Sequence, residues 1–172
     1  MAVIQKRCYF FVTPQEIYEN LKDKFGESVV SFEEDIADSF IVIATESVAD
    51  VAQYLAEDEG LAFDFLMCLS GVDLGAKDPN YYVVYHLYSM THRHKLVLKI
   101  VLPKEEEPHV ATVEHIWRTA NWHEREAYDL FGIIFDGHSD LRRILLPDDW
   151  EGYPMRKDYT EPEFYRGMRV PY

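Results

Sequence analysis

The stretch that decides the fold runs from Tyr81 to Leu102 and reads YYVVYHLYSM-THRH-KLVLKIVL. Tyr81–Met90 and Lys95–Leu102 are rich in β-branched and aromatic residues, as strands are, and they lie on either side of the short run THRH. In the second run, leucine or isoleucine at the even-numbered positions alternates with lysine or valine, so one face belongs to the core and the other is partly wet. The stretch therefore predicts a β-hairpin.

On the N-terminal side of this hairpin, the sequence predicts two helices and two strands. The run TPQE from Thr13 to Glu16 has the residues of a capping box, with proline at the first helical position, and Gly26 ends the helix. Strand-like runs follow at Val29–Phe32 and Phe40–Ala44, joined by the acidic turn 33–35, and Ser47 caps a second helix that ends near Gly60. Residues 61–69 are apolar, and periodicity does not decide between a strand and a buried connection.

On the C-terminal side, helical character is predicted at Thr112–Thr119 and again at Asn121–Phe131, where Gly132 is the stop. This order of elements implies an α+β fold in which helices pack on an antiparallel or mixed sheet. We expect a globular domain at residues 1–137 that includes the helix 121–131.

Residues 138–172, called the C-terminal arm below, have a different composition. They contain four of the eight prolines and six aromatic side chains, with 6 basic and 7 acidic residues against 11 and 24 in residues 1–137. Disordered tails are poor in aromatic residues. We therefore expect an extended segment that becomes ordered when it packs on partner subunits.

Composition argues against several classes of partner. The net charge of −14 opposes binding to nucleic acid and adsorption to anionic lipid. No run of about 18 apolar residues predicts a membrane span, and the N-terminus lacks the features of a secretory signal. Any association with a membrane is therefore expected to go through a complex.

The residues that bind metals in other proteins do not form a ligand pattern here. Cys8 and Cys68 lie far apart and are expected to be buried free thiols. The seven histidines form neither a Cys/His set nor an H-E-x-x-H pair. His92 and His94 could flank one strand face at the turn, but no third ligand is indicated, so we expect exposed turn histidines.

The helix 121–131 is the segment in which residues that could carry chemistry are most dense. Asn121 and Glu124 could form a capping box, and Arg125 and Asp129 share a helix face. Glu124 and Glu126 diverge by about 200°, which weakens an acid/base pair between them. We expect a solvated or interfacial charged helix.

The segment from Glu124 to Tyr159 carries a resemblance to a known family. It reads EREAYDLFGIIFDGHSDLRRIL to Leu145 and LPDDWEGYPMRKDY from Leu146, and it resembles the signature of the C subunit of NADH:quinone oxidoreductase, respiratory complex I. Ser139 departs from the family, which usually has proline after the histidine, and this loosens the local turn. Residues 1–120 match in their order of elements only.

The resemblance implies a structural subunit in the peripheral part of a proton-pumping complex, with enzyme activity at the level of the whole complex. It implies no catalytic residue and no cofactor in this chain, since partner subunits would bind FMN, the iron–sulfur clusters and quinone. The expected partners are the quinone-pocket and iron–sulfur subunits, on the cytoplasmic face of the membrane (the matrix side in a mitochondrion). The signature residues expected at partner contacts are Glu124, Arg125, Glu126, Tyr128, Asp129, His138, Asp140, Arg142, Arg143, Trp150, Tyr153, Arg156, Lys157, Asp158 and Tyr159.

Within this signature, Arg142 and Arg143 are adjacent, so their side chains should diverge. We expect one to pair inward with Glu126 or Asp129 and the other to meet a neighbouring subunit.

Three other readings remain open. The chain could be the equivalent subunit of an energy-converting membrane-bound hydrogenase or of a ferredoxin-dependent photosynthetic complex. It could be a stand-alone enzyme that uses Glu124, Glu126 and His138, in which case these groups should converge in a pocket. A generic acidic binding module would leave the paired arginines of the aromatic C-terminal arm unexplained.

Overall fold

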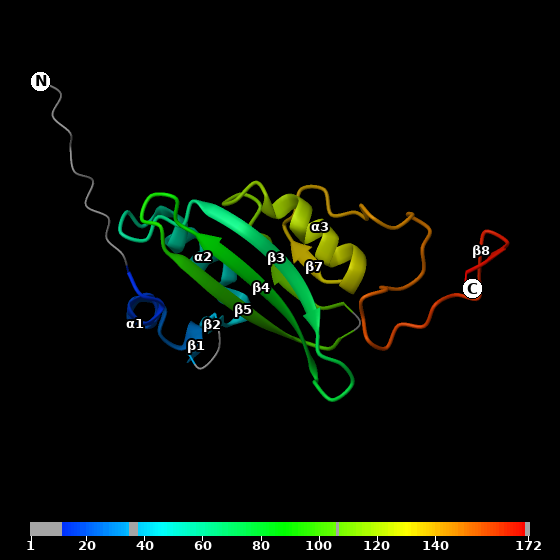
Figure 1. Ribbon diagram of the computed structural model, residues 1–172, viewed down its shortest axis with the longest axis horizontal. Coiled ribbons are helices and arrows are strands. Elements are labelled where there is room, and N and C mark those ends of the chain that lie inside the picture. The colour runs from blue at the N-terminus through cyan, green and yellow to red at the C-terminus, as the bar shows by residue number, and fades with distance from the viewer. Residues whose placement is uncertain (1–11, 35–37, 106, 171–172) are drawn as a thin grey trace, which may run out of the picture.

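The computed structural model describes residues 12–34, 38–105 and 107–170, so Cys8 and part of the acidic turn lie outside the described residues. The elements, in chain order, are α1 (Pro14–Phe25), η1 (Gly26–Ser28), β1 (Val29–Glu33), β2 (Phe40–Ile43), η2 (Thr45–Ser47), α2 (Val48–Glu57), β3 (Phe65–Asp73), β4 (Asn80–Tyr88), β5 (Lys95–Pro103), β6 (His109–Ala111), α3 (Ala120–Phe131), β7 (Ile134–Asp136), β8 (Phe164–Tyr165) and β9 (Met168–Arg169). The α+β class is confirmed (Figure 1).

The hairpin predicted at residues 81–102 lies within a mixed five-stranded sheet, in the order β1-β2-β5-β4-β3. Strands β4 and β5 pair antiparallel from Asn80 opposite Pro103 to Tyr88 opposite Lys95. The pairing of β2 with β5 is parallel, while β1–β2 and β3–β4 are antiparallel. Along β4, Tyr81, Val83, Tyr85 and Leu87 are buried and the residues between them are half-buried.

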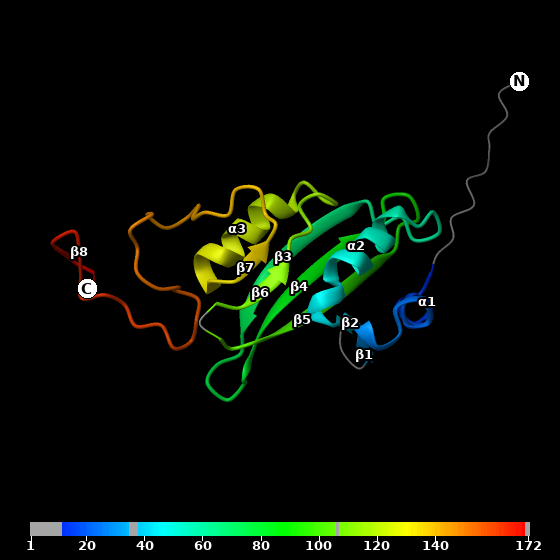
Figure 2. The same ribbon diagram turned by 180° about the vertical axis from the view of Figure 1, so that it is seen from behind.

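The inner face of the sheet carries the core. Figure 2 shows α2 lying across this face, and its Val51 and Leu55 are fully buried there. Helix α3 covers β3 on the same side, since the Phe131 ring occupies the space beside Gly71, which pairs with the inward-pointing Val83. A Cβ atom on Gly71 would lie only 2.6 Å from that ring.

The N-terminal cap predicted from the sequence is present at α1 but not at α2. The capping box of α1 is confirmed, because the Glu16 N–H donates to Thr13 Oγ1 and Glu16 Oε2 accepts from the Thr13 N–H. At α2, Ser47 occupies the N-cap position without a capping hydrogen bond, since its hydroxyl bonds to Ser28 instead.

The sequence did not decide whether residues 61–69 form a strand or a buried connection, and the structure has one after the other. Residues 61–64 form a tight connection, in which Ala62 has a φ of 44°, and β3 begins at Phe65. The predicted helix at 112–119 is wrong. Strand β6 pairs in parallel with β7. After β6 the chain makes two short turns, one closed by the Trp117 N–H on the Val113 carbonyl and one by the Ala120 N–H on the Trp117 carbonyl.

The two histidines of the hairpin turn are buried, so the expectation of exposed turn histidines is wrong. His92 Nε2 lies 2.8 Å from the carbonyl oxygen of Glu59 and His94 Nε2 lies 2.7 Å from that of Leu61. Each ring therefore donates to the 59–61 connection and ties the turn to it. Cys68 is half-buried rather than buried, and its Sγ lies 3.2 Å from Ser70 Oγ.

The C-terminal arm leaves the body at the end opposite α1 (Figure 1). Within the described residues, no helix has both the length and the apolar character needed to cross a bilayer.

Candidate partner interface

Helix α3 buries charged side chains, so the expectation of a solvated helix is wrong for three of its four charged residues. Glu124 and Asp129 are fully buried and Arg125 nearly so, whereas Glu126 is exposed. The capping box expected between Asn121 and Glu124 is also wrong, because α3 begins at Ala120 and Asn121 Nδ2 donates to Glu114 Oε2 at 2.6 Å. Charged groups are rarely buried without partners, so their partners define the site.

Glu124 is held by the chain that precedes α3. Its Oε2 accepts from the Thr112 hydroxyl and its Oε1 accepts from the Val113 N–H at 2.8 Å. Burial raises the pKa of Glu124 to about 7, although these two hydrogen bonds act in the opposite direction. The carboxyl group therefore exchanges its proton near neutral pH.

His138, the first residue of the C-terminal arm, packs against Glu124 with its side chain fully buried. The Asp140 N–H donates to His138 Nδ1 at 3.0 Å, and Nε2 lies 3.1 Å from the Asn121 carbonyl. Because Nδ1 accepts, Nε2 carries the proton that is donated to the Asn121 carbonyl. Nε2 also lies 3.4 Å from Glu114 Oε2 and 3.9 Å from Glu124 Oε2, so the ring packs between these two carboxylates.

Asp129 binds the C-terminal arm directly. Its Oδ1 accepts from Arg143 Nη1 at 2.8 Å, and its Oδ2 accepts from three successive backbone N–H groups, those of Ile144, Leu145 and Leu146, at 2.7–3.0 Å. Burial opposes ionisation, but the bonds from Leu146, Arg143 and their neighbours outweigh it and lower the pKa of Asp129. A fixed carboxylate thus shapes the first turn of the C-terminal arm.

The two adjacent arginines diverge, and the expected inward pairing with Asp129 is confirmed for Arg143. Its other nitrogen, Nη2, donates to the carbonyls of Trp150 and Gly152 at 3.1 and 3.0 Å. The Arg142 side chain is 67% exposed, and within the part of the chain that the structure describes it bonds to the exposed Asp140 alone, through Nε at 3.0 Å. Its carbonyl accepts from the buried Arg125 Nε.

The C-terminal end of α3 is closed by the C-terminal arm. Gly132 ends the helix in the left-handed region at a φ of 71°, and a Cβ there would lie 2.5 Å from the Tyr153 ring. Arg156 Nε donates to the Phe131 carbonyl at 2.6 Å, and its guanidinium lies over the rings of Tyr153 and Tyr81. A cation at this position also suits the helix dipole.

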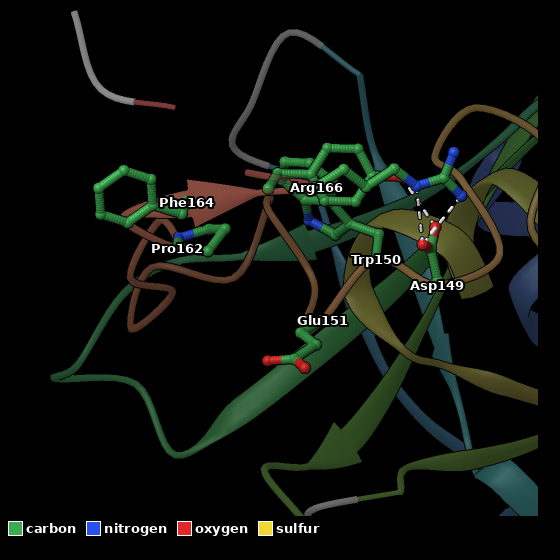
Figure 3. Close-up of a pocket in the computed structure, with 7 residues that line it drawn as sticks. Asp149, Trp150, Glu151, Pro162, Phe164 and Arg166 are labelled. Atoms are coloured by element: carbon green, nitrogen blue, oxygen red, sulfur yellow. Dashed lines mark hydrogen bonds and ion pairs between the residues drawn. The ribbon is translucent and has the colours of Figure 1, made fainter. Parts of the chain in front are cut away.

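The far end of the C-terminal arm folds back on itself (Figure 3). Arg166 donates to Asp149 Oδ2 at 2.9 and 3.0 Å, Tyr165 donates to Asp149 Oδ1 at 2.8 Å, and the Trp150 and Tyr165 ring centroids are 5.0 Å apart. These contacts enclose a hollow of about 240 Å³, at whose rim Phe164 is 59% exposed.

Comparison with known proteins identifies the family. Residues 41–165 match the family described as "Respiratory-chain NADH dehydrogenase, 30 Kd subunit". The chain belongs to this family. The NADH-quinone oxidoreductase C subunit of Chloroherpeton thalassium is 48% identical over 162 residues, which are 92% of this chain and 66% of that protein. The corresponding protein of Chlorobium phaeobacteroides, which has the same name, is 41% identical over 157 residues, 90% of this chain and 93% of that protein.

A solved structure shares the fold. A chain of the membrane-bound sulfane sulfur reductase, an archaeal respiratory membrane complex, superposes with a TM-score of 0.70 at 23% identity over 85% of each chain. At that identity the likeness concerns the fold alone. The names of the relatives place this member of the 30 kDa subunit family among the subunits of a multi-subunit respiratory assembly.

The family match spans every signature residue, and the structure divides these residues into two groups. One group has its side chains buried or half-buried within the chain, and the other is exposed. The inward group is Glu124, Arg125, Tyr128, Asp129, His138, Arg143, Trp150, Tyr153, Arg156 and Tyr159, and the exposed group is Glu126, Asp140, Arg142, Lys157 and Asp158. Contact of either group with partner subunits stays a prediction.

The sequence did not predict which residues outside the signature segment would form hydrogen bonds with it. Thr112 binds Glu124 of α3, and Glu114 binds Ser139 at the root of the C-terminal arm. Asp73 accepts from the Lys157 N–H at 2.8 Å while Lys104 Nζ lies 2.7 Å from its other oxygen. These residues are far from the signature in sequence, and Asp73 alone gave a signal, as an acidic residue that ends an apolar run.

The reading as a stand-alone enzyme required Glu124, Glu126 and His138 to converge. Glu124 and His138 do meet, but Glu126 lines a different cleft, between β3 and α3, whose other residues are mostly apolar. Among the described residues, no three His, Cys, Asp or Glu side chains come together in the manner of a metal site.

Proposed function

We propose that this chain is a non-catalytic, cofactor-free structural subunit in the peripheral part of a proton-pumping NADH:quinone oxidoreductase. It packs there against the quinone-pocket and iron–sulfur subunits, on the cytoplasmic face of the membrane. NADH oxidation, quinone reduction and proton translocation belong to the whole complex. FMN, the clusters and quinone are bound by other subunits.

The observation that carries this proposal is how the charged side chains of α3 and the C-terminal arm are used. Asp129 of α3 accepts from Arg143 of the arm, Arg143 also donates to the Trp150 carbonyl, and Arg156 of the arm donates to the Phe131 carbonyl at the end of α3. These groups therefore hold the arm on the helix and position a surface instead of facing a substrate. The C-terminal arm in turn presents exposed apolar side chains, namely Leu145, Met155, Phe164 and Met168, each at least 49% exposed. Apolar tips on a polar, charged segment are typical of a protein–protein contact.

The test is purification of the tagged chain in two settings. Purified from native membranes, the chain should bring the other subunits of an NADH:quinone oxidoreductase with it. Expressed alone, it should contain less than 0.1 equivalent, roughly, of iron, zinc or flavin by elemental analysis and absorbance. One metal or flavin per isolated chain, lost on substitution of a histidine, would refute the cofactor-free role.

The electron donor of the purified assembly separates this proposal from the equivalent subunit of a related complex. The relatives at 41% and 48% identity are named as NADH-quinone oxidoreductase subunits, which favours NADH. If the purified assembly oxidised ferredoxin or evolved hydrogen and did not oxidise NADH, the chain would instead be the equivalent subunit of a ferredoxin-dependent photosynthetic complex or of a membrane-bound hydrogenase.

A further inference from the structure

One face of the sheet is uncovered by any described helix. Figure 1 looks onto strands β3, β4 and β5, and the helices α2 and α3 lie behind them, whereas Figure 2 shows the covered side. The register places side chains from the three strands in rows across this uncovered face. Its positions, called the open sheet face below, are Phe65, Met67, Cys68, Ser70, Val72, Tyr82, Val84, His86, Tyr88, Lys95, Val97, Lys99 and Val101. Lys95, at one end of the face, is paired with Asp38.

The open sheet face is more apolar than a sheet face that contacts water. A solvated face of an antiparallel sheet usually carries charged and polar residues. Here valine, tyrosine and sulfur-containing side chains dominate, and Phe65 and Met67 are 45% and 51% exposed. The chain has 31 acidic residues, yet the open sheet face contains no aspartate or glutamate.

Lys99 lies near the middle of this face, opposite Val84. Its Nζ is 4.0 Å from the centroid of the Tyr82 ring and 5.0 Å from that of Phe40. Among the described residues, no carboxylate forms an ion pair with Lys99, although Asp78, which accepts from the Tyr82 hydroxyl at 2.7 Å, lies close enough to interact with its charge. A cation surrounded by apolar side chains becomes costly when water is removed, unless an anion arrives with the covering surface.

We propose that the open sheet face is a second docking surface, which receives another protein subunit presenting apolar side chains and a carboxylate that pairs with Lys99. This inference rests on the proposed membership of an assembly, but Lys99 lies on the sheet and outside the signature segment; the open sheet face meets α3 and the C-terminal arm only at the cleft that Ser70 shares with Glu126 and Met155. A second copy of this chain fits poorly, because a symmetric contact would bring two Lys99 residues together without an anion. A lipid surface fits poorly because the net charge of −14 is repelled by anionic headgroups.

The test compares the reactivity of lysines in the isolated chain and in the purified assembly. Reductive methylation of Lys99 should fall at least tenfold, roughly, on assembly, whereas Lys77, an exposed lysine of the β3–β4 loop, should change less than about twofold. Equal labelling of Lys99 in both states, or protection of Lys99 already in the isolated monomer, would overturn the proposal.

Carbodiimide cross-linking identifies the covering group. The reagent activates a carboxylate as an acylisourea, the Lys99 amine displaces the urea, and an amide bond forms with overall loss of water to the reagent. Mass spectrometry should find Lys99 joined to an aspartate or glutamate of another polypeptide. A link to a second copy of this chain would contradict the proposal in favour of a dimer.

A pair of charge reversals supplies the functional readout. Lys99→Glu should weaken retention of the chain in the assembly by roughly tenfold, and Lys77→Glu, with the same change in charge, should not. Reversing the cross-linked carboxylate of the partner to lysine should restore retention of Lys99→Glu. If the wild-type chain copurifies with the complex but Lys99 stays reactive, only this inference fails; if nothing copurifies, the proposed function fails.

Discussion

At the scale of single residues, the two buried carboxylates of α3 have opposite protonation preferences because their donors differ. Asp129 accepts four hydrogen bonds, one of them from a guanidinium, and burial is more than offset. Glu124 accepts two bonds from neutral donors, and burial dominates. Asp129 is therefore a permanent anion that fixes the C-terminal arm, whereas Glu124 is a proton-exchanging group behind it.

Replacement of Asp129 by asparagine should destabilise the chain by roughly 3–5 kcal/mol, because it leaves the Arg143 charge and at least one backbone N–H without an anionic partner. Denaturant unfolding measures this loss. The control is Asp158→Asn, an exposed signature carboxylate, which should cost about 0.5 kcal/mol or less. Equal stability of the two variants would mean that the Asp129 contacts contribute nothing.

The pH dependence of stability should reveal Glu124. Its folded pKa of about 7 lies above the ordinary value near 4.3, so the folded state binds more protons between these pH values. The contribution of Glu124 to the free energy of unfolding is complete below about pH 4.3 and is lost as the pH rises through 7. The loss amounts to roughly 2 kcal/mol from pH 5 to 8. Glu124→Gln, which mimics the neutral acid, should remove that slope. A slope unchanged in the variant would assign the pH dependence to other groups.

At the scale of elements, the joins between segments depend on a few close contacts. The β4–β5 turn is held to the 59–61 connection by His92 and His94, and α3 is held to the C-terminal arm at Gly132. The first join places two buried rings against backbone carbonyls, and the second depends on the missing side chain at Gly132, so a single substitution can test each of them.

The turn contact should weaken in acid. Burial lowers the pKa of His94, so the folded state binds fewer protons than the unfolded state once the pH falls below about 6.5. The contribution of His94 to the free energy of unfolding is complete above about pH 6.5 and is lost as the pH falls toward the pKa of the folded state. His94→Gln, which keeps a donor for the Leu61 carbonyl, should show a shallower loss of stability between pH 7 and 5. An identical acid profile would exclude His94 as its source.

The contact at the end of α3 can be measured with a double-mutant cycle. Gly132→Ala should cost about 1 kcal/mol for the left-handed backbone and a further 1–3 kcal/mol, roughly, for overlap with the Tyr153 ring. In a Tyr153→Ala background the overlap with the ring is gone, so the cost should fall to that of the backbone and of a small shift of the flexible Arg156 side chain, whose Nη2 would lie 2.7 Å from the added Cβ. The same cost in both backgrounds would show that the ring does not pack on Gly132 in solution.

At the scale of the whole molecule, the sequence predicts the elements that depend on neighbouring residues but not the contacts between distant segments. The capping box of α1 and the β4–β5 hairpin depend on neighbours in sequence, and the structure has both. Val113, Ile116 and Trp117 have helical spacing, but β6 pairs in parallel with β7 and the chain then makes two short turns instead of a helix. The same pairing brings Thr112 and Val113 to Glu124, so the burial of Glu124 could not be seen in the sequence. The divergence of Arg142 and Arg143 could, because it follows from their adjacency.

The central claim is that the signature segment builds the assembly and takes no part in its chemistry. Arg142→Ala removes an exposed guanidinium that, among the described residues, holds Asp140 alone, so the isolated chain should keep its thermal melt. Arg143→Ala removes the inward contacts and should lower that melt.

The measurement that tests this claim most directly is turnover per assembled complex in the Arg142→Ala strain, with abundance taken from native gels and NADH:quinone activity normalised to it. We predict at least about twofold less assembled complex, with turnover per complex equal to that of the wild type. A normal amount of complex with reduced turnover would contradict the claim and assign the signature segment a direct part in the reaction.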